Sequence, residues 1–315
     1  MSETPLLICG DAFNPEERDR LSSAWPSAFV SGPAGMADLD LGLRSGIKAI
    51  AFKGHKPFGG DEMDLFPRLG VIANYGVGYD AIDVAAASTR SIGVTNTPDV
   101  LSDDVADLAV ALMVAQARTM IRGHAHVASG RWAQEGEMPL SRKVSGSTVG
   151  IVGLGRIGRE IADRLAAFKC EIHYNSRSEK ETPGWTWHGD VVSLATAVDF
   201  LVIALVGGPA TKGYVTREAI QALGPRGVVI NISRGSTIDE GALLDALESG
   251  AIAGAGLDVY ENEPNIDPRF LKLANVVLQP HQGSGTVETR RAMAELQLAN
   301  ISAFLEGKPL VTPVN

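Results

Sequence analysis

Short apolar runs alternate along this chain with longer stretches that have the spacing of amphipathic helices. The runs are rich in β-branched and aliphatic residues, as strands are. They occupy Leu6–Gly10, Ile47–Phe52, Val71–Gly76, Ile92–Thr97, Ser147–Gly153, Cys170–Asn175, Asp199–Leu205, Gly227–Ser233, Ala253–Val259 and Asn275–His281. This alternation predicts an α/β fold in which helices cover parallel sheets.

Two helical stretches are unusually long. Residues 102–132 contain no proline, so we expect one helix that crosses between domains, with Gly123 as its candidate break. Residues 286–306 predict a second long amphipathic helix after the last strand. The pattern alone does not assign this second helix to a domain.

The strand runs divide near residue 100, which predicts two domains. At 315 residues the chain exceeds what one hydrophobic core usually organises, and its 45% hydrophobic and 21% charged residues are ordinary for a globular protein. Only the second group of runs opens on a glycine fingerprint. We therefore expect a nucleotide-binding domain and a second domain that acts as its lid or substrate-binding half.

Charge and cysteine content restrict the classes of partner. A formal charge of −9 and a pI near 5.2 argue against nucleic acid and against anionic membranes, because a phosphate backbone requires a basic surface. Cys9 and Cys170 give neither a disulfide framework nor a zinc-ligand spacing, which favours a reducing compartment. The N-terminal residues lack a secretory signal pattern, so we expect a cytoplasmic protein.

A G-x-G-x-x-G fingerprint follows one strand run and precedes a helical stretch, as a dinucleotide site requires. Gly153 permits a tight turn, Gly155 lets the backbone approach a pyrophosphate, and Gly158 allows close packing of the helix on the strand. The helix N-terminus offers N–H groups to the anion. The expected turn consists of Gly153, Leu154, Gly155, Arg156 and Ile157.

The strand about 20 residues past the fingerprint ends without an acidic residue. An acid there usually binds the ribose of NAD and would repel a 2′-phosphate. This chain has Asn175, Ser176, Arg177 and Ser178 instead. Arg177 can form charge-assisted bonds to a phosphate, and Asn175 and Ser176 can add donors. We therefore predict NADP(H) as cofactor, with NAD(H) as a weaker alternative.

Three later segments place polar residues directly after predicted strands. They carry Arg234 in NISRGSTIDE, Glu263 in LDVYENEP and His281 in LQPHQGSG. Since ligands gather at the carboxyl ends of parallel strands, we expect the three side chains to converge on one crevice. Each alone would suit a loop, a turn or a structural histidine, so only the combination indicates catalysis.

Other kinds of catalytic site have little support. His124 and His126 are two positions apart on a predicted helix and would point to different faces, so we expect no metal site. No G-x-S-x-G turn occurs, and neither cysteine has an evident base, which argues against a nucleophilic mechanism.

The fingerprint together with NYGVGYDAID, NISRG, GAGLDVYENEP and VVLQPHQGS resembles the D-isomer-specific 2-hydroxyacid dehydrogenase family, from about residue 45 to the end. Within it, NTPDVLSDDVADLA, YNSRS and GKPLVTPV most resemble NADPH-dependent glyoxylate/hydroxypyruvate reductases and hydroxyphenylpyruvate reductases. The resemblance implies a Rossmann NADP-binding domain over residues 101–284. Residues 1–100 and 285–315 would form a discontinuous, flavodoxin-like substrate-binding domain, and the protein would be a homodimer.

The resemblance also implies roles for individual residues. His281 would protonate the carbonyl oxygen, with Glu263 orienting its ring and raising its pKa. Arg234 would bind the carboxylate and keto oxygen of the substrate. The N–H groups of Val77 and Gly78 would receive the same carboxylate.

Two implied contacts have competing interpretations. Asp258 would bond the nicotinamide carboxamide or cap a turn at the strand end. Lys53 would contact the substrate carboxylate or be an ordinary loop cation. The remaining cofactor contacts implied by the resemblance are Leu205, Ile232, Ser233, Arg234, His281 and Gly283.

These expectations combine into an NADPH-dependent reductase of small 2-keto acids, with glyoxylate and hydroxypyruvate as first substrates. Arylpyruvates such as hydroxyphenylpyruvate are the next alternative. A non-enzymatic, nucleotide-sensing scaffold like the related corepressors also stays open, because the Arg–Glu–His set does not exclude it.

Overall fold

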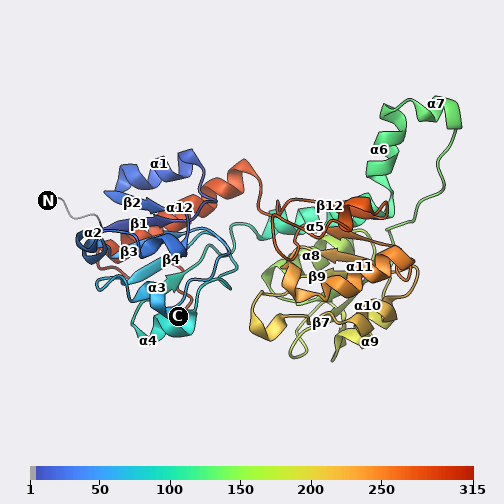
Figure 1. Ribbon diagram of the computed structural model, residues 1–315. Coiled ribbons are helices and arrows are strands. Elements are labelled where there is room, and N and C mark those ends of the chain that lie inside the picture. The colour runs from blue at the N-terminus through green and yellow to red at the C-terminus, as the bar shows by residue number, and fades with distance from the viewer. Residues whose placement is uncertain (1–4) are drawn as a thin grey trace. The chain divides into compact units, whose positions relative to one another are not determined.

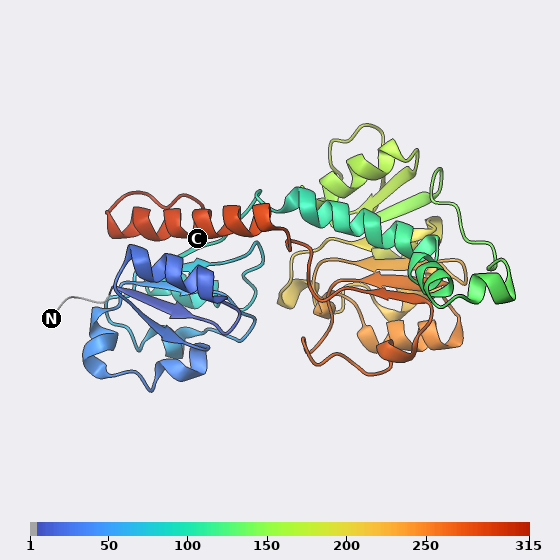
Figure 2. The ribbon, with the colours of Figure 1, turned by 90° about the horizontal axis from the view of Figure 1, so that it is seen from above.

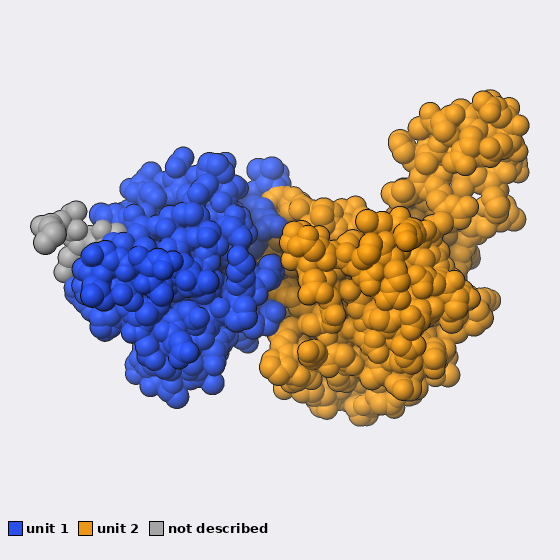
Figure 3. Space-filling view, viewed as in Figure 1, with its two compact units in different colours: residues 1–100, 287–315 blue, residues 101–286 orange. Residues whose placement is uncertain are grey.

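The computed structural model describes residues 5–315, and the chain divides into two compact units (Figure 3). Unit 1 comprises Met1–Val100 and Val287–Asn315, and unit 2 comprises Leu101–Thr286. The first four residues of the N-terminal segment, on which the expectation about a secretory signal partly rests, lie outside the described residues. Within residues 5–315 no helix is both long and apolar enough to span a membrane.

Unit 1 is built on a five-stranded parallel sheet in the order β2-β1-β3-β4-β5. Its strands are β1 (Leu6–Cys9), β2 (Ser27–Val30), β3 (Ala49–Phe52), β4 (Val71–Asn74) and β5 (Gly93–Thr95). The strand ends Cys9, Phe52 and Asn74 are opposite one another, so their following loops leave the same edge. This is the flavodoxin-like strand order, which confirms that expectation.

Helices from both ends of the chain cover this sheet (Figures 1 and 2). They are α1 (Pro15–Ala24), α2 (Leu41–Gly46), the 3-10 helix η1 (Pro33–Met36), α3 (Gly60–Met63), α4 (Val84–Thr89) and α12 (Val287–Leu305). Ile301 of α12 is fully buried with Leu6 and Ile8 of β1. The helix predicted near the C-terminus is confirmed, and it belongs to the unit formed mainly by the first 100 residues.

Unit 2 contains a seven-stranded parallel sheet in the order β12-β11-β10-β9-β6-β7-β8. Its strands are β6 (Thr148–Val152), β7 (Glu171–Asn175), β8 (Thr186–His188), β9 (Phe200–Ile203), β10 (Val228–Asn231), β11 (Gly254–Leu257) and β12 (Val276–Leu278). Read from β8, the order is the 3-2-1-4-5-6 arrangement of dinucleotide-binding folds with one strand added, so the Rossmann prediction is confirmed.

Two sets of helices pack on this sheet. α5 packs against α8 and β11, whereas α9, α10 and α11 share a second apolar core with the strands. The helices are α5 (Ser102–Ala117), α6 (Met120–Ala128), α7 (Arg131–Glu135), α8 (Arg156–Ala167), α9 (Val191–Ala197), α10 (Arg217–Leu223) and α11 (Glu240–Ser249), with 3-10 helices η2 (Pro209–Thr211), η3 (Gly235–Thr237) and η4 (Phe270–Lys272).

The single helix predicted over residues 102–132 is wrong, because α5, α6 and α7 occupy this stretch. Thr119 has a φ of 48° and Gly130 a φ of 75°, and both interrupt the helical hydrogen bonds. Gly123, the expected break, lies inside α6. A threonine in the left-handed region carries no helix-breaking signal in the sequence, which explains the error.

Strands β2 and β8 were not predicted from the sequence. Each lies at the edge of its sheet and pairs with one neighbour only. Their residues are mostly half-buried or exposed, unlike the central strands. An edge strand has less apolar surface to bury, so it lacks the continuous apolar run that identified the others.

Candidate active site

The strands of unit 2 end at one level, so the residues that follow them leave one edge of the sheet. Val152 at the end of β6 is opposite both Asn175 and Ile203. The same register continues through β10 and β11 to Leu278 of β12. The chain order reverses at β6, between β7 and β9. Ligands of doubly wound sheets bind outside the carboxyl ends at such a point.

The glycine fingerprint forms the turn between β6 and α8. Gly153 has a φ of 97°, and a Cβ atom there would lie 2.8 Å from the carbonyl oxygen of Ala204. A Cβ atom on Gly158 would lie 2.1 Å from the carbonyl oxygen of Gly153, so helix and turn are in closest contact. Gly155 caps the 12-residue α8 without a side-chain bond, which leaves the first N–H groups available to an anion. This turn fits the pyrophosphate of a dinucleotide.

The other residues expected around the cofactor lie at the same edge. Arg156 and Ile157 begin α8, and Leu154 is buried in the turn. Leu205 follows β9, with its Cδ2 3.1 Å from the Cβ position of Gly153. Ile232 and Ser233 follow β10 and are buried. Their contact with a cofactor stays a prediction.

The structure does not support the expected contact of the Asn175 side chain with a phosphate. Asn175 is buried, its Nδ2 donates to the carbonyl oxygen of His188 at 2.9 Å, and its Oδ1 accepts from the Tyr214 hydroxyl at 2.8 Å. This amide therefore fixes the end of β7. Ser176, Arg177 and Ser178 begin the loop that follows, and Arg177 is exposed.

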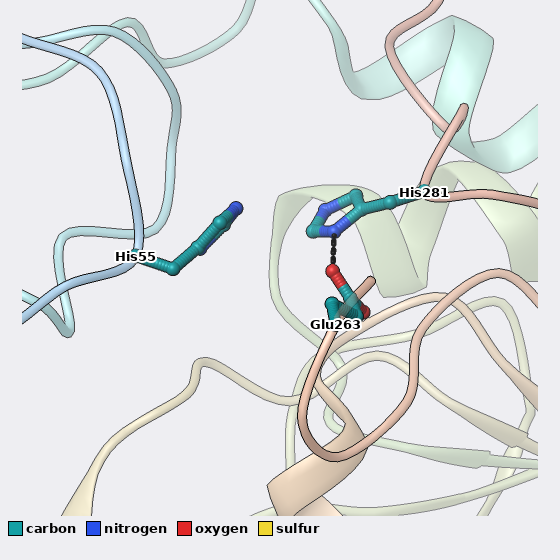
Figure 4. Close-up of side chains that lie close together, drawn as sticks. All are labelled: His55, Glu263 and His281. Carbon is teal, nitrogen blue, oxygen red and sulfur yellow. Dashed lines mark hydrogen bonds and ion pairs between the residues drawn. The ribbon is translucent and has the colours of Figure 1, made fainter. Parts of the chain in front are cut away.

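His281 and Glu263 form a hydrogen-bonded pair at the carboxyl edge (Figure 4). Nδ1 of His281 lies 2.7 Å from Oε2 of Glu263. An ionised carboxylate only accepts, so Nδ1 carries a hydrogen in this pair. The second oxygen of Glu263 accepts the N–H of Tyr260 at 2.8 Å. The two side chains are 31% and 23% exposed, which leaves the sheltered pair within reach of a small ligand.

Tyr260 ties together the loops that carry this pair, and no sequence pattern identified it. Its hydroxyl lies 3.0 Å from the carbonyl oxygens of Leu257 and Gln279, and it accepts the N–H of Gln279 at 3.1 Å. Burial raises the pKa of Tyr260, so the hydroxyl keeps its proton. One phenol thus links the ends of β11 and β12.

Arg234 follows β10 in a tightly packed turn. Its carbonyl oxygen accepts hydrogen bonds from Asn231 Nδ2 at 3.0 Å and from Thr237 Oγ1 at 2.7 Å. A Cβ atom on the next residue, Gly235, would lie 2.0 Å from the carbonyl carbon of Tyr260. The turn that presents Arg234 is therefore in direct backbone contact with the segment that leads to the catalytic candidates.

For Asp258 the structure supports turn capping. Its carboxylate is buried and accepts the N–H of Gln282 at 2.6 Å and that of Gly283 at 2.8 Å. Burial raises the pKa of Asp258, while these two N–H groups favour the charged form. The carbonyl oxygen of Asp258 also accepts the N–H of His281 at 2.9 Å. Asp258 thus positions the histidine loop, and a contact with the nicotinamide stays only a prediction.

In unit 1 a donor-rich turn follows β4. Asn74 Nδ2 donates to the carbonyl oxygens of Gly76 and Gly78, at 3.1 and 2.9 Å. Asn96 Nδ2 donates to that of Val77 at 2.9 Å. Within residues 5–315 the N–H groups of Val77 and Gly78 have no hydrogen-bond partner. The two asparagines, which sequence reasoning missed, occupy the carbonyl groups and leave N–H groups for an anion.

Lys53 fits neither sequence interpretation fully, because it forms a partly buried ion pair. Its Nζ lies 2.7 and 2.6 Å from the two carboxylate oxygens of Glu17, and 4.4 Å from the centroid of the Tyr75 ring. The Lys53 and Glu17 side chains are 13% and 11% exposed. Burial lowers the pKa of Lys53, and Glu17 opposes that change. The expected substrate contact therefore has no support within unit 1.

Comparisons with known proteins agree with this arrangement. The chain is 46% identical over 268 residues to a hydroxyphenylpyruvate reductase of Plectranthus scutellarioides, covering 85% of both chains. It is 41% identical to a 2-ketogluconate reductase of Gluconobacter oxydans over 100% of both chains. A crystal structure of an NADPH-dependent glyoxylate/hydroxypyruvate reductase from Sinorhizobium meliloti, in complex with NADP and malonate, superimposes with a TM-score of 0.93 at 42% identity. That comparison covers 99% of this chain and 97% of the other.

The family model for the NAD binding domain of D-isomer specific 2-hydroxyacid dehydrogenases matches residues 110–283. The matched segment contains the glycine turn, Arg234, Glu263 and His281. The chain therefore belongs to the D-isomer specific 2-hydroxyacid dehydrogenase family, an oxidoreductase family that uses a nicotinamide dinucleotide.

Proposed function

We propose that this protein reduces small 2-keto acids to 2-hydroxy acids with NADPH, and that glyoxylate and hydroxypyruvate are its first substrates. The observation that carries the proposal is the His281–Glu263 hydrogen bond of 2.7 Å at the carboxyl edge of a dinucleotide-binding sheet. Reduction of a carbonyl group requires a proton for the developing alkoxide, and a carboxylate-supported imidazole supplies one.

His281 donates that proton from Nε2, because Glu263 occupies Nδ1. The carboxylate of Glu263 accepts from Nδ1 and so fixes the orientation of the ring. NADPH, when bound, would supply the hydride for the carbonyl carbon. The chain residues proposed to hold it are the glycine turn, the first N–H groups of α8 and the loop that follows β7.

The carboxylate of the substrate is the second feature that the chain can recognise. In unit 2 we assign this role to the guanidinium of Arg234. In unit 1 the candidate donors for a carboxylate are the N–H groups of Val77 and Gly78, which have no hydrogen-bond partner within residues 5–315. A planar guanidinium suits bidentate binding of a carboxylate and also polarises the keto oxygen. Local donors of this kind explain how a protein of net charge −9 binds an anionic substrate.

In this proposal unit 1 is the substrate-binding domain and unit 2 the NADP-binding domain. The active protein is a homodimer. The arm formed by α6 and α7 supports this last point, because it projects from the rest of unit 2 (Figure 1) and exposes apolar side chains. Ile121, Val127 and Trp132 are 60%, 58% and 60% exposed. Exposed apolar side chains gathered on one projecting arm favour a surface that a partner covers.

The substrate assignment is tested by following NADPH absorbance with glyoxylate, hydroxypyruvate, hydroxyphenylpyruvate and 2-ketogluconate. We expect the highest kcat/KM with glyoxylate or hydroxypyruvate. The identity to a hydroxyphenylpyruvate reductase makes arylpyruvate reduction the second candidate, and it would replace the first if hydroxyphenylpyruvate gave the higher value. Absence of turnover with all four acids would contradict the proposed reaction.

Arg177→Ala is expected to remove the preference for NADPH. Loss of a charged hydrogen bond to a phosphate costs about 1.5–3 kcal/mol, which corresponds to a roughly 10-fold to 150-fold weaker Kd for NADPH. The Kd for NADH should change by less than about twofold, because NADH lacks the 2′-phosphate. Titration of protein with each nucleotide, followed by fluorescence, measures both constants.

Arg226→Ala is the matched control for this variant. Its side chain is 84% exposed and precedes β10, so it lies at the opposite edge of the same sheet. The Arg226→Ala substitution removes one positive charge, as Arg177→Ala does, but at a position outside the proposed nucleotide site. Equal weakening of NADPH and NADH by Arg177→Ala would refute the cofactor assignment.

A further inference from the structure

The loop between β7 and β8, which we propose binds the 2′-phosphate, has no net charge of its own. Residues 176–182 contain Arg177 and Lys180 but also Glu179 and Glu181, so two positive charges balance two negative ones. All four side chains are exposed. If such a loop were unconstrained, its balanced charges would give no net attraction for a phosphate. Discrimination therefore depends on how the loop is held, because the held conformation decides which charge meets the ligand.

One side chain holds the middle of this loop. Tyr174 of β7 is fully buried, and its hydroxyl accepts the N–H of Lys180 at 2.8 Å. The same hydroxyl lies 3.1 Å from the carbonyl oxygen of Lys180 and donates to it. The phenol thus accepts from the main-chain N–H of Lys180 and donates to the main-chain carbonyl oxygen of the same residue. The loop is closed between the end of β7 and Lys180, with Arg177 inside the closed segment.

The first residue of the loop is held from the neighbouring strand. The indole N–H of Trp187 in β8 donates to the carbonyl oxygen of Ser176 at 3.2 Å. The hydroxyl of Ser176 in turn donates to the carbonyl oxygen of Ser178 at 2.6 Å. The main chain on both sides of Arg177 is therefore fixed by hydrogen bonds that do not use its side chain.

The far side of the loop is anchored on α8, the helix of the glycine turn. Arg159 donates to the carbonyl oxygen of Glu181 at 3.0 Å, and its guanidinium lies 5.7 Å from the ring centroid of Trp185. This arginine is engaged with the main chain of the loop. The loop is thus attached to β7, to β8 and to the helix whose N-terminus we propose binds the pyrophosphate.

We propose that Tyr174 is a positioning residue for cofactor choice: its hydroxyl holds the charge-balanced loop in the one conformation that presents Arg177 to a 2′-phosphate, and Trp187 assists it. The inference rests on the proposed NADPH preference. Tyr174 itself contacts neither substrate nor reacting atoms. Pre-organisation of this kind raises affinity for the ligand group that the loop contacts and leaves the rest of the nucleotide unaffected.

Tyr174→Phe tests the proposal, because it keeps the buried ring and removes only the hydroxyl. Binding is measured by calorimetry with 2′,5′-ADP, 5′-AMP, NADPH and NADH. We expect Kd to rise about 5-fold to 10-fold for 2′,5′-ADP and NADPH, the factor that loss of one or two hydrogen bonds produces. The Kd for 5′-AMP and NADH should stay within twofold. With saturating NADPH, kcat should be unchanged while KM for NADPH rises.

Two further variants separate positioning from general damage. Trp187→Phe should also raise the Kd for 2′,5′-ADP and NADPH, but by a smaller factor, because it removes a single hydrogen bond at an edge strand. Tyr214→Phe is the matched control, because its hydroxyl bonds the Asn175 side chain and not the loop. It should leave the ratio of the two nucleotide affinities unchanged.

The other possible results of these binding measurements would contradict either the positioning role of Tyr174 or the NADPH preference itself. Equal weakening of 2′,5′-ADP and 5′-AMP by Tyr174→Phe, or no change in either, overturns the positioning role. If Arg177→Ala removes the NADPH preference and Tyr174→Phe does not, the proposed function stands and this inference alone fails. If the wild-type protein binds 2′,5′-ADP and 5′-AMP equally, the NADPH preference fails and the inference fails with it.

Discussion

His281→Ala is expected to lower kcat for NADPH-dependent reduction of glyoxylate or hydroxypyruvate by about 10²-fold to 10⁴-fold, the usual contribution of a positioned general acid. The reason is that alanine leaves the developing alkoxide to be protonated by water. Binding of NADPH should change by less than about threefold, because the proposed nucleotide site consists mainly of the glycine turn and the loop after β7. Stopped-flow absorbance measures the rate, and fluorescence titration measures the binding.

Two further variants test whether the decrease in kcat is specific to His281. His124→Ala removes an exposed histidine from α6 and should keep the wild-type kcat. Glu263→Gln keeps a side chain that can accept from Nδ1 but removes the negative charge, so we expect a decrease smaller than that of His281→Ala. A wild-type turnover no faster than that of His281→Ala would favour the nucleotide-sensing scaffold over an enzyme.

Gly235→Ala is expected to have the second large effect, although it adds a single methyl group. The new Cβ atom would lie 2.0 Å from the carbonyl carbon of Tyr260 and 2.3 Å from the nitrogen of Glu261, both in the main chain. Main chain cannot turn aside as a side chain can, so the Arg234 turn and the segment before Glu263 must separate. Overpacking of this kind costs about 1–3 kcal/mol of stability.

The decrease in kcat/KM of Gly235→Ala should be larger than its decrease in folding stability alone would cause. A shift of about 1 Å between groups that act on one substrate can reduce the rate by about 10²-fold, so we expect kcat/KM to fall by at least that factor. Thermal unfolding and steady-state kinetics on the same preparation separate the two effects. Gly241→Ala is the control, because its Cβ would meet only Asp239 Oδ1 at 3.6 Å. Unchanged kcat/KM in Gly235→Ala would show that this contact does not position Arg234.

The sequence was most informative about the sheet centres. Every strand predicted from an apolar run is present, since strands buried on both faces need continuous apolar residues. The two missed strands, β2 and β8, are edges, where that requirement is relaxed. The break at Thr119 was missed for a different reason. Thr119 adopts a left-handed conformation with a φ of 48°, and nothing in the local residue pattern records it.

The site shows a similar division. Glycines and strand-end polar residues were predictable, because a tight turn and a carboxyl edge restrict the residue types that fit there. The structure brings Glu263 to His281, as the sequence led us to expect. The local sequence does not show which partner an amide at a strand end will bond. We expected the Asn175 side chain to contact the cofactor, but in the structure it bonds His188 and Tyr214 and so fixes the end of its own strand. Tyr260 and Asn74 were missed because their partners are main-chain groups.

The buried Ile301 has a consequence for the order of folding on the ribosome. Ile301 covers Leu6 and Ile8 in unit 1, yet it is synthesised about 290 residues after them. At about 5–20 residues per second, the nascent β1 waits roughly 15–60 s for this cover. Residues 101–286 form a continuous segment and can complete their own core during that interval. Unit 1 therefore cannot complete its apolar core until α12 has been synthesised.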